Sequence, residues 1–120
     1  MMIRTLIILV AGLVTVSSSA WAYRVIDQIE DGYELALVMV RLPLSERGTI
    51  VFRVCEECNT TALRVTNATR YFANGAPVEL SELRELAEAA RATAAGRDRA
   101  GIFISYDIAS LRVNRVRLSY

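Results

Sequence analysis

The first 22 residues of this chain form an apolar leader, and this leader decides how much of the chain is left to fold. Arg4 supplies a positive charge, residues 6–16 form an apolar run, and Ala20-Trp21-Ala22 has the small residues of a signal-peptidase site. The run is shorter than the roughly 20 residues that span a bilayer. We predict a secretory signal peptide over residues 1–22 and a single exported globular domain over residues 23–120.

Export determines where the domain folds and which partners it meets. We expect a periplasmic or secreted protein with no stable membrane insertion after the leader is cleaved. The chain has 14 basic residues, all of them arginine, against 13 acidic residues, and its arginine-only, alanine-rich composition is typical of a bacterial genome rich in GC. A net charge close to zero argues against general nucleic-acid binding, which depends on an excess of basic charge. We therefore expect a protein or an envelope component, and no nucleic acid, as the partner.

Hydrophobic alternation predicts a domain made mostly of strands. Asp31-Gly32 separates two β-type runs, which predicts a hairpin between residues 23–30 and 33–42. The second run is apolar on both faces, as a central strand would be. Residues 49–66 alternate on either side of the two cysteines and predict a second hairpin.

The second half of the chain predicts further strands. Arg70-Tyr71-Phe72 forms a short strand pattern that is followed by the turn dipeptide Asn74-Gly75. The last two strand patterns of the chain cover residues 101–107 and 111–120. The apolar positions of the last strand change phase, which predicts a bulge near Asn114-Arg115.

One segment has helical periodicity. Ser81 is a favourable N-cap, Glu82 and Glu85 lie in the first turns, and Gly96 is a natural stop. We predict an amphipathic helix over residues 81–95. The fold class is therefore α+β and mostly β, with a small antiparallel sheet or a partly closed barrel of about six strands beside this helix.

Cys55 and Cys58 enclose two glutamates at the expected hairpin turn. Residues that face each other across a tight hairpin have Cα atoms about 4.5 to 5.5 Å apart, within the range of a disulfide. An oxidising compartment favours a structural bridge. Closing so small a ring stabilises a fold by about 2 kcal/mol.

Two other uses of the cysteines stay open. A redox cysteine usually lies at a helix N-terminus, whereas a β-type run follows Cys58, and Glu56 and Glu57 would repel a thiolate unless Arg53 and Arg64 lie beside them. Short bridges are nevertheless reducible, which keeps thiol–disulfide exchange as an alternative. Zinc needs more ligands than two cysteines without histidine supply. We therefore predict no metal and no cofactor, although reduced thiolates would suit copper(I).

Arginines gather on the last strand. Arg112, Arg115 and Arg117 form a candidate surface for an anionic partner such as an envelope polymer or a lipid head group, together with Arg53, Arg64 and Arg70. The same alternation is typical of an ordinary strand with one solvated face. Both interpretations stay open at this point.

Little in the sequence points to catalysis. The chain has no histidine, so a Ser-His-Asp triad is excluded, and it lacks P-loop and dinucleotide motifs. We expect a small non-enzymatic accessory or binding protein whose hairpin loop is pinned by a Cys55–Cys58 disulfide. The alternative is a thiol–disulfide exchange or metal-handling protein that uses the same loop.

Overall fold

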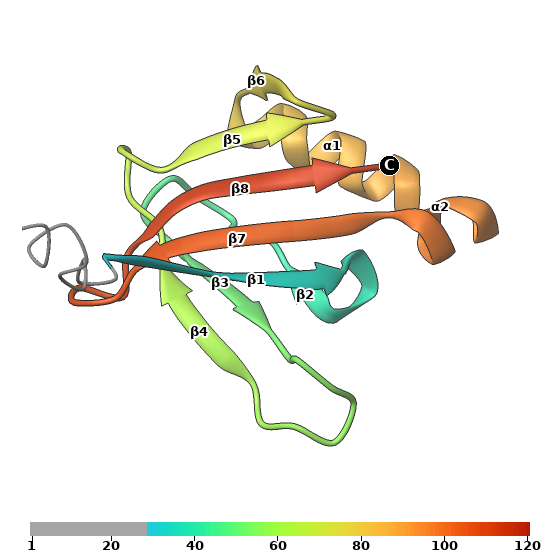
Figure 1. Cartoon of the computed structure of the whole chain (residues 1–120). Coiled ribbons are helices and arrows are strands. Elements are labelled where there is room, and N and C mark those ends of the chain that lie inside the picture. The colour runs from blue at the N-terminus through green and yellow to red at the C-terminus, as the bar shows by residue number, and fades with distance from the viewer. Residues whose placement is uncertain (1–28) are drawn as a thin grey trace, which may run out of the picture.

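The computed structural model describes residues 29–120, so the predicted leader and residues 23–28 lie outside the described part (Figure 1). That part contains eight strands, one short 3-10 helix and two α-helices. The strands form a five-stranded and a three-stranded sheet, which do not close into a barrel. The predicted α+β class with mostly β structure is confirmed.

The large sheet has the order β1-β7-β8-β5-β6. Its strands are β1 (Glu30–Ala36), β7 (Gly101–Asp107), β8 (Val113–Ser119), β5 (Arg70–Ala73) and β6 (Ala76–Val78). The neighbours are antiparallel, except that β5 and β8 run parallel. The expectation of a purely antiparallel sheet is wrong for this pair, because the chain crosses from β6 through the helices to β7 before β8 returns beside β5.

The small sheet confirms the hairpin predicted over residues 49–66. It consists of β2 (Val40–Arg41), β3 (Thr49–Phe52) and β4 (Thr61–Arg64) in the order β2-β3-β4. The antiparallel register places Thr49 opposite Arg64 and Phe52 opposite Thr61. The cysteine loop therefore joins the ends of β3 and β4 that lie farthest from Arg64.

The hairpin predicted around Asp31-Gly32 is wrong, because both residues lie inside β1. A Cβ atom built on Gly32 would lie 2.7 Å from Cζ of Phe103, so the glycine leaves room for an aromatic ring of β7. The single central strand predicted over residues 33–42 is also wrong. β1 is an edge strand that pairs with β7, and the 3-10 helix η2 (Leu37–Met39) redirects the chain into the small sheet.

The helix predicted over residues 81–95 is divided into α1 (Leu80–Arg91) and α2 (Ala94–Arg99). Glu79, not Ser81, is the N-cap of α1. Thr93 is the N-cap of α2, and its hydroxyl accepts a 2.9 Å hydrogen bond from the backbone N–H of Gly96. Gly96 therefore lies inside the second helix and does not stop the first, which corrects the prediction.

Three local predictions in the second half of the chain are confirmed. Residues 70–73 form a strand, and the turn at Asn74-Gly75 has φ angles of 48° and 87°. Ser105 pairs with Arg115 and Tyr106 pairs with Val113, so Asn114 is the extra residue of a bulge.

The core lies between the large sheet on one side and α1 with the small sheet on the other. In Figure 1, α1 lies behind β5 and β8 in the upper part of the view, and the small sheet lies behind and below the large sheet. The buried side chains from these three layers include Ile102, Ile104, Val116, Leu118, Leu83, Ala87, Ile50, Phe52 and Leu63. Within residues 29–120, no helix is long and apolar enough to cross a membrane.

Candidate functional site

The outer face of the large sheet, which is turned away from α1, carries arginine and phenylalanine side chains. Side chains alternate along a strand, so Val116 and Leu118 enter the core while Arg117 is exposed on the other face. Phe103 follows the same rule on β7 and is 40% exposed. No helix or sheet of the described part covers this face (Figure 1).

Two arginines lie over one ring on this face. The guanidinium carbons of Arg70 and Arg117 are 5.8 and 5.4 Å from the ring centroid of Phe72. Parallel pairing of β5 with β8 produces this arrangement, because it sets Phe72 opposite Arg117. Such distances give favourable cation–π interactions. We call Arg70, Phe72 and Arg117 the arginine–phenylalanine patch; Phe103 extends it, since it lies opposite Arg117 on β7.

Arg115 shares the outer face but has partners within the fold. Its guanidinium pairs with the carboxylate of Glu30 and donates a 3.3 Å hydrogen bond to Oγ of Ser105. The hydrogen bond from Ser105, together with the contact and charge of Arg115, lowers the pKa of Glu30. Arg115 therefore ties β8 to the first residue of β1, and much of its charge is already compensated.

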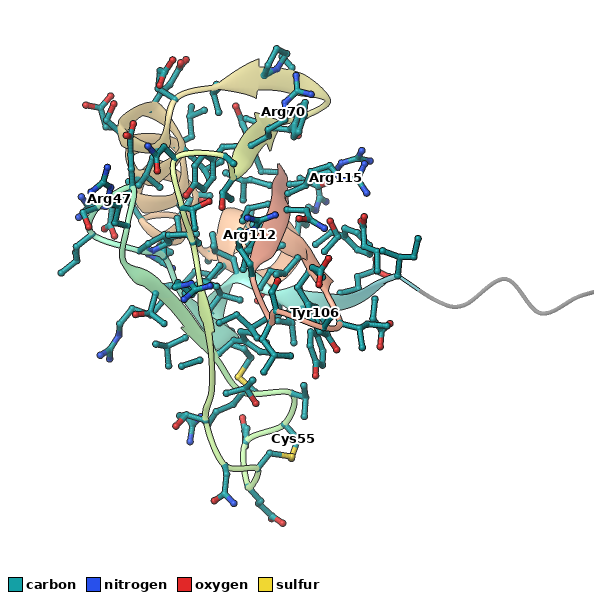
Figure 2. The ribbon with its side chains drawn as sticks, turned by 90° about the vertical axis from the view of Figure 1, so that its left-hand side faces the viewer. Arg47, Cys55, Arg70, Tyr106, Arg112 and Arg115 are labelled. Atoms are coloured by element: carbon teal, nitrogen blue, oxygen red, sulfur yellow. A yellow bond between two sulfur atoms is a disulfide. The ribbon has the colours of Figure 1, made fainter. Side chains whose placement is uncertain are left out.

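Arg112 lies apart from the other two predicted arginines. Figure 2 shows it at the end of the sheet, whereas Arg115 lies on the side away from the helices. Arg112 forms an isolated backbone bridge with Arg64, where the two sheets meet. The structure therefore separates the predicted trio Arg112, Arg115 and Arg117, and it brings Arg70 to Arg117.

The cysteine pair is a disulfide with a Cα–Cα distance of 5.1 Å. Cys55 and Cys58 are not cross-strand neighbours of the ladder, because they lie in the loop between β3 and β4. The backbone N–H of Cys58 donates to the carbonyl of Cys55 at 3.2 Å, so the bridge closes a four-residue turn. Figure 2 shows Cys55 far from the main body of the fold, at the end of the hairpin.

The surroundings of the disulfide offer few groups that could stabilise a thiolate or bind a metal ion. Arg53 donates a 3.2 Å hydrogen bond to the carbonyl of Glu56 and so lies beside the loop. Arg64 is at the other end of β4 and cannot offset the loop glutamates. The cysteines precede a strand instead of a helix. Across residues 29–120, no group of three potential metal-ligating side chains is found.

An aromatic cluster that the sequence analysis did not single out lies under β1. The ring of Tyr33 is 4.8 Å from that of Phe52 and stacks on Tyr106 at 5.6 Å. The hydroxyl of Tyr106 donates to Asp31 at 3.4 Å. A hydrogen bond with Tyr33, burial and the charge of Asp31 raise the pKa of Tyr106 to about 12. The sequence signal that could have identified this cluster is the position of Tyr33 in the alternating pattern of the residues that form β1.

Comparison with known proteins identifies no relative of this chain. No protein-family model matches the chain, and neither a curated protein nor a solved structure shows significant similarity to it.

Proposed function

We propose that this chain is a small, non-enzymatic exported binding protein whose arginine–phenylalanine patch contacts an acidic surface on a partner protein. The observation that carries the proposal is the pair of exposed guanidinium groups over Phe72, on a sheet face that no described helix or sheet covers. Arginine and aromatic side chains are enriched in protein interfaces and dominate their binding energy.

The position of the patch on strands supports this function. β5 and β8 are interior strands of the five-stranded sheet, so their backbones are held by ladder hydrogen bonds on both sides. Stacking on Phe72 holds the two guanidinium groups in place before binding, which reduces the side-chain entropy that binding would cost. Fixed guanidinium groups suit the two oxygens of a carboxylate.

The disulfide has a supporting role in this proposal. It closes the turn of a projecting loop, in which the residues Val54 and Glu56 are exposed. A pinned loop can serve as a second contact, because the loop does not have to be ordered on binding. The patch and the loop belong to different sheets, and each can be altered without the other.

Capture from envelope extracts tests the proposal. We expect the immobilised wild-type protein to retain a defined partner, and the double variant Arg70→Ala/Arg117→Ala to lose most of it. The matched control is Arg47→Ala/Arg97→Ala, which removes the same number of exposed arginines elsewhere. Figure 2 shows Arg47 on the opposite side of the molecule from Arg115. Capture should weaken in high salt, because salt screens exposed charges.

Two results would contradict the proposal. Equal loss in the patch variant and the control variant would show general charge attraction instead of a defined site. Equal binding of the wild-type protein and the patch variant would remove the patch from the interface. Vesicles of phosphatidylglycerol form a separate arm, and patch-dependent binding to them without any protein partner would point to a lipid surface.

The alternative function, thiol–disulfide exchange, is favoured by one observation: Cys55 is exposed at the end of the hairpin, where a thiolate of another protein could reach it. Exchange requires attack on this disulfide through a mixed disulfide with the partner. The test is trapping with Cys58→Ser, which leaves Cys55 to hold the mixed disulfide. A trapped partner would support exchange, and rapid reduction by glutathione without any trapped partner would not.

A further inference from the structure

We propose that a pocket between β5 and the start of α1 binds a primary ammonium group. The pocket has a volume of about 170 Å³. Its polar wall includes Glu46, Asn67, Tyr71 and Glu79, and its apolar wall includes Val78 and Leu80. Neighbouring residues on β5 alternate, so Tyr71 lies on the face opposite Phe72. The inference is therefore independent of the arginine–phenylalanine patch.

The hydroxyl of Tyr71 is the strongest sign of a ligand. Tyr71 is 6% exposed, and its hydroxyl has no hydrogen-bond partner among the described residues. The neighbouring threonine hydroxyls are engaged: Thr69 donates to the carbonyl of Val113 at 2.7 Å, and Thr66 accepts from the N–H of Ala68 at 3.1 Å. A buried hydroxyl without a partner costs stability, which a ligand in the pocket would recover.

The charge of the pocket wall selects a cation. Glu46 and Glu79 supply two carboxylates, and neither forms an ion pair within residues 29–120. Burial and the charge of Glu46 raise the pKa of Tyr71 to about 12, so its phenol is neutral at physiological pH. Arg84 lines an adjoining hollow with both glutamates without pairing to either. The pocket therefore combines two negative groups with one neutral oxygen.

An alkylammonium group fits this set of partners better than a metal ion does. Its three N–H groups can donate hydrogen bonds to the phenol oxygen and to the carboxylates. The methylene groups attached to it can contact Val78 and Leu80. A neutral phenol is not among the usual oxygen ligands of calcium or magnesium. The chain contains no lysine, so none of its own side chains supplies the ammonium group, and the ligands we consider are a free amine and a lysine of another protein.

Titration of the full-length protein with two probes tests the inference. The probes are n-butylammonium chloride and Nα-acetyl-lysine amide, followed by NMR shifts of residues around Tyr71. We expect saturable binding of a single equivalent. Glu46→Gln and Glu79→Gln should each weaken binding by about tenfold. Tyr71→Phe should weaken it by about threefold, since it removes a neutral acceptor and leaves the ring in place.

The matched control is Glu57→Gln, which removes a carboxylate on the cysteine loop, and it should leave binding unchanged. Binding of butylammonium but not of the lysine derivative would assign the pocket to free amines, and binding of both would admit a lysine side chain. Shifts that do not saturate, equal weakening by Glu57→Gln, or tighter binding of Ca²⁺ than of either amine would overturn the inference.

Discussion

At the residue scale, two glycines have roles in packing where the sequence suggested turns. Gly32 lies under the ring of Phe103, and Gly96 lies against the last turn of α1. A Cβ atom on Gly96 would be 2.2 Å from the carbonyl oxygen of Ala90, a backbone atom that cannot easily move. These glycines are needed because another segment approaches closely, not because the chain turns there.

Gly96→Ala tests this explanation. By helix propensity alone, the change inside α2 would stabilise the protein by about 1 kcal/mol. Because the methyl group would collide with Ala90, we expect a loss of about 1 to 3 kcal/mol in the free energy of unfolding, measured in urea. The matched control, Ala94→Gly, should cost about 1 kcal/mol or less. A stabilised Gly96→Ala variant would contradict the packing role.

The contacts of Glu30 with Ser105 and Arg115, which lower its pKa, predict an acid-sensitive contribution to stability. The pKa of Glu30 is lowered from 4.5, so its contribution is complete above that value and is lost as the pH falls through the folded-state pKa. Glu30→Gln should lower the melting temperature at pH 7, and its difference from the wild type should shrink towards pH 3. Glu34→Gln on the same strand is the control. A difference that stays constant with pH would contradict the prediction.

At the element scale, the hairpin of β3 and β4 is held by its own ladder, and the disulfide closes a turn beyond it. The exposed loop contributes little to the core, whereas Ile50, Phe52 and Leu63 anchor the strands. We therefore expect the hairpin to form whether or not the disulfide closes its loop.

The double variant Cys55→Ser/Cys58→Ser should keep the hairpin and lose part of its stability. We expect the free energy of unfolding to fall by about 2 kcal/mol, because a short closed loop restricts the unfolded chain only modestly. Amide exchange should show that protection in β3 and β4 falls by no more than this loss of global stability, while β3 and β4 keep their slowly exchanging amides. A loss of protection in both strands that exceeds the global loss would mean that the disulfide holds the sheet together.

At the scale of the whole molecule, one face of the large sheet supports the core, and no helix or sheet within residues 29–120 covers the other face. Tyr71 and Tyr106 lie on the core side, close to the carboxylates Glu46 and Asp31 respectively. Ionising either phenol would place a second negative charge beside the first. The layered architecture thus makes the protein sensitive to alkali through two separate tyrosines.

An alkaline titration should reveal both tyrosines. Each has its pKa raised from 10 to about 12. Their contribution to stability is therefore present below pH 10 and is lost as the pH rises through 12. Ultraviolet absorbance should show a phase near pH 12 that accompanies unfolding and shrinks in Tyr71→Phe and in Tyr106→Phe. Complete ionisation of all tyrosines near pH 10 in the folded protein would contradict this prediction.

The sequence by itself predicted features that depend on a few neighbouring residues. These include the Asn74-Gly75 turn, the hairpin over residues 49–66, the bulge at Asn114 and the disulfide. Each depends on backbone preferences or on alternation along a single strand, which a local pattern contains. The leader is a further prediction of this kind and lies outside the described residues.

The tertiary structure decided the features that depend on which distant segment of the chain packs against a given residue. It placed Gly32 under Phe103, divided the helix before Gly96 and set Arg117 beside Phe72 through the parallel pairing of β5 with β8. It also left the hydroxyl of Tyr71 unpaired within residues 29–120. A one-dimensional pattern shows which face of a strand is apolar, but it does not show what covers that face, because contacts between distant residues are fixed by the packing of the layers.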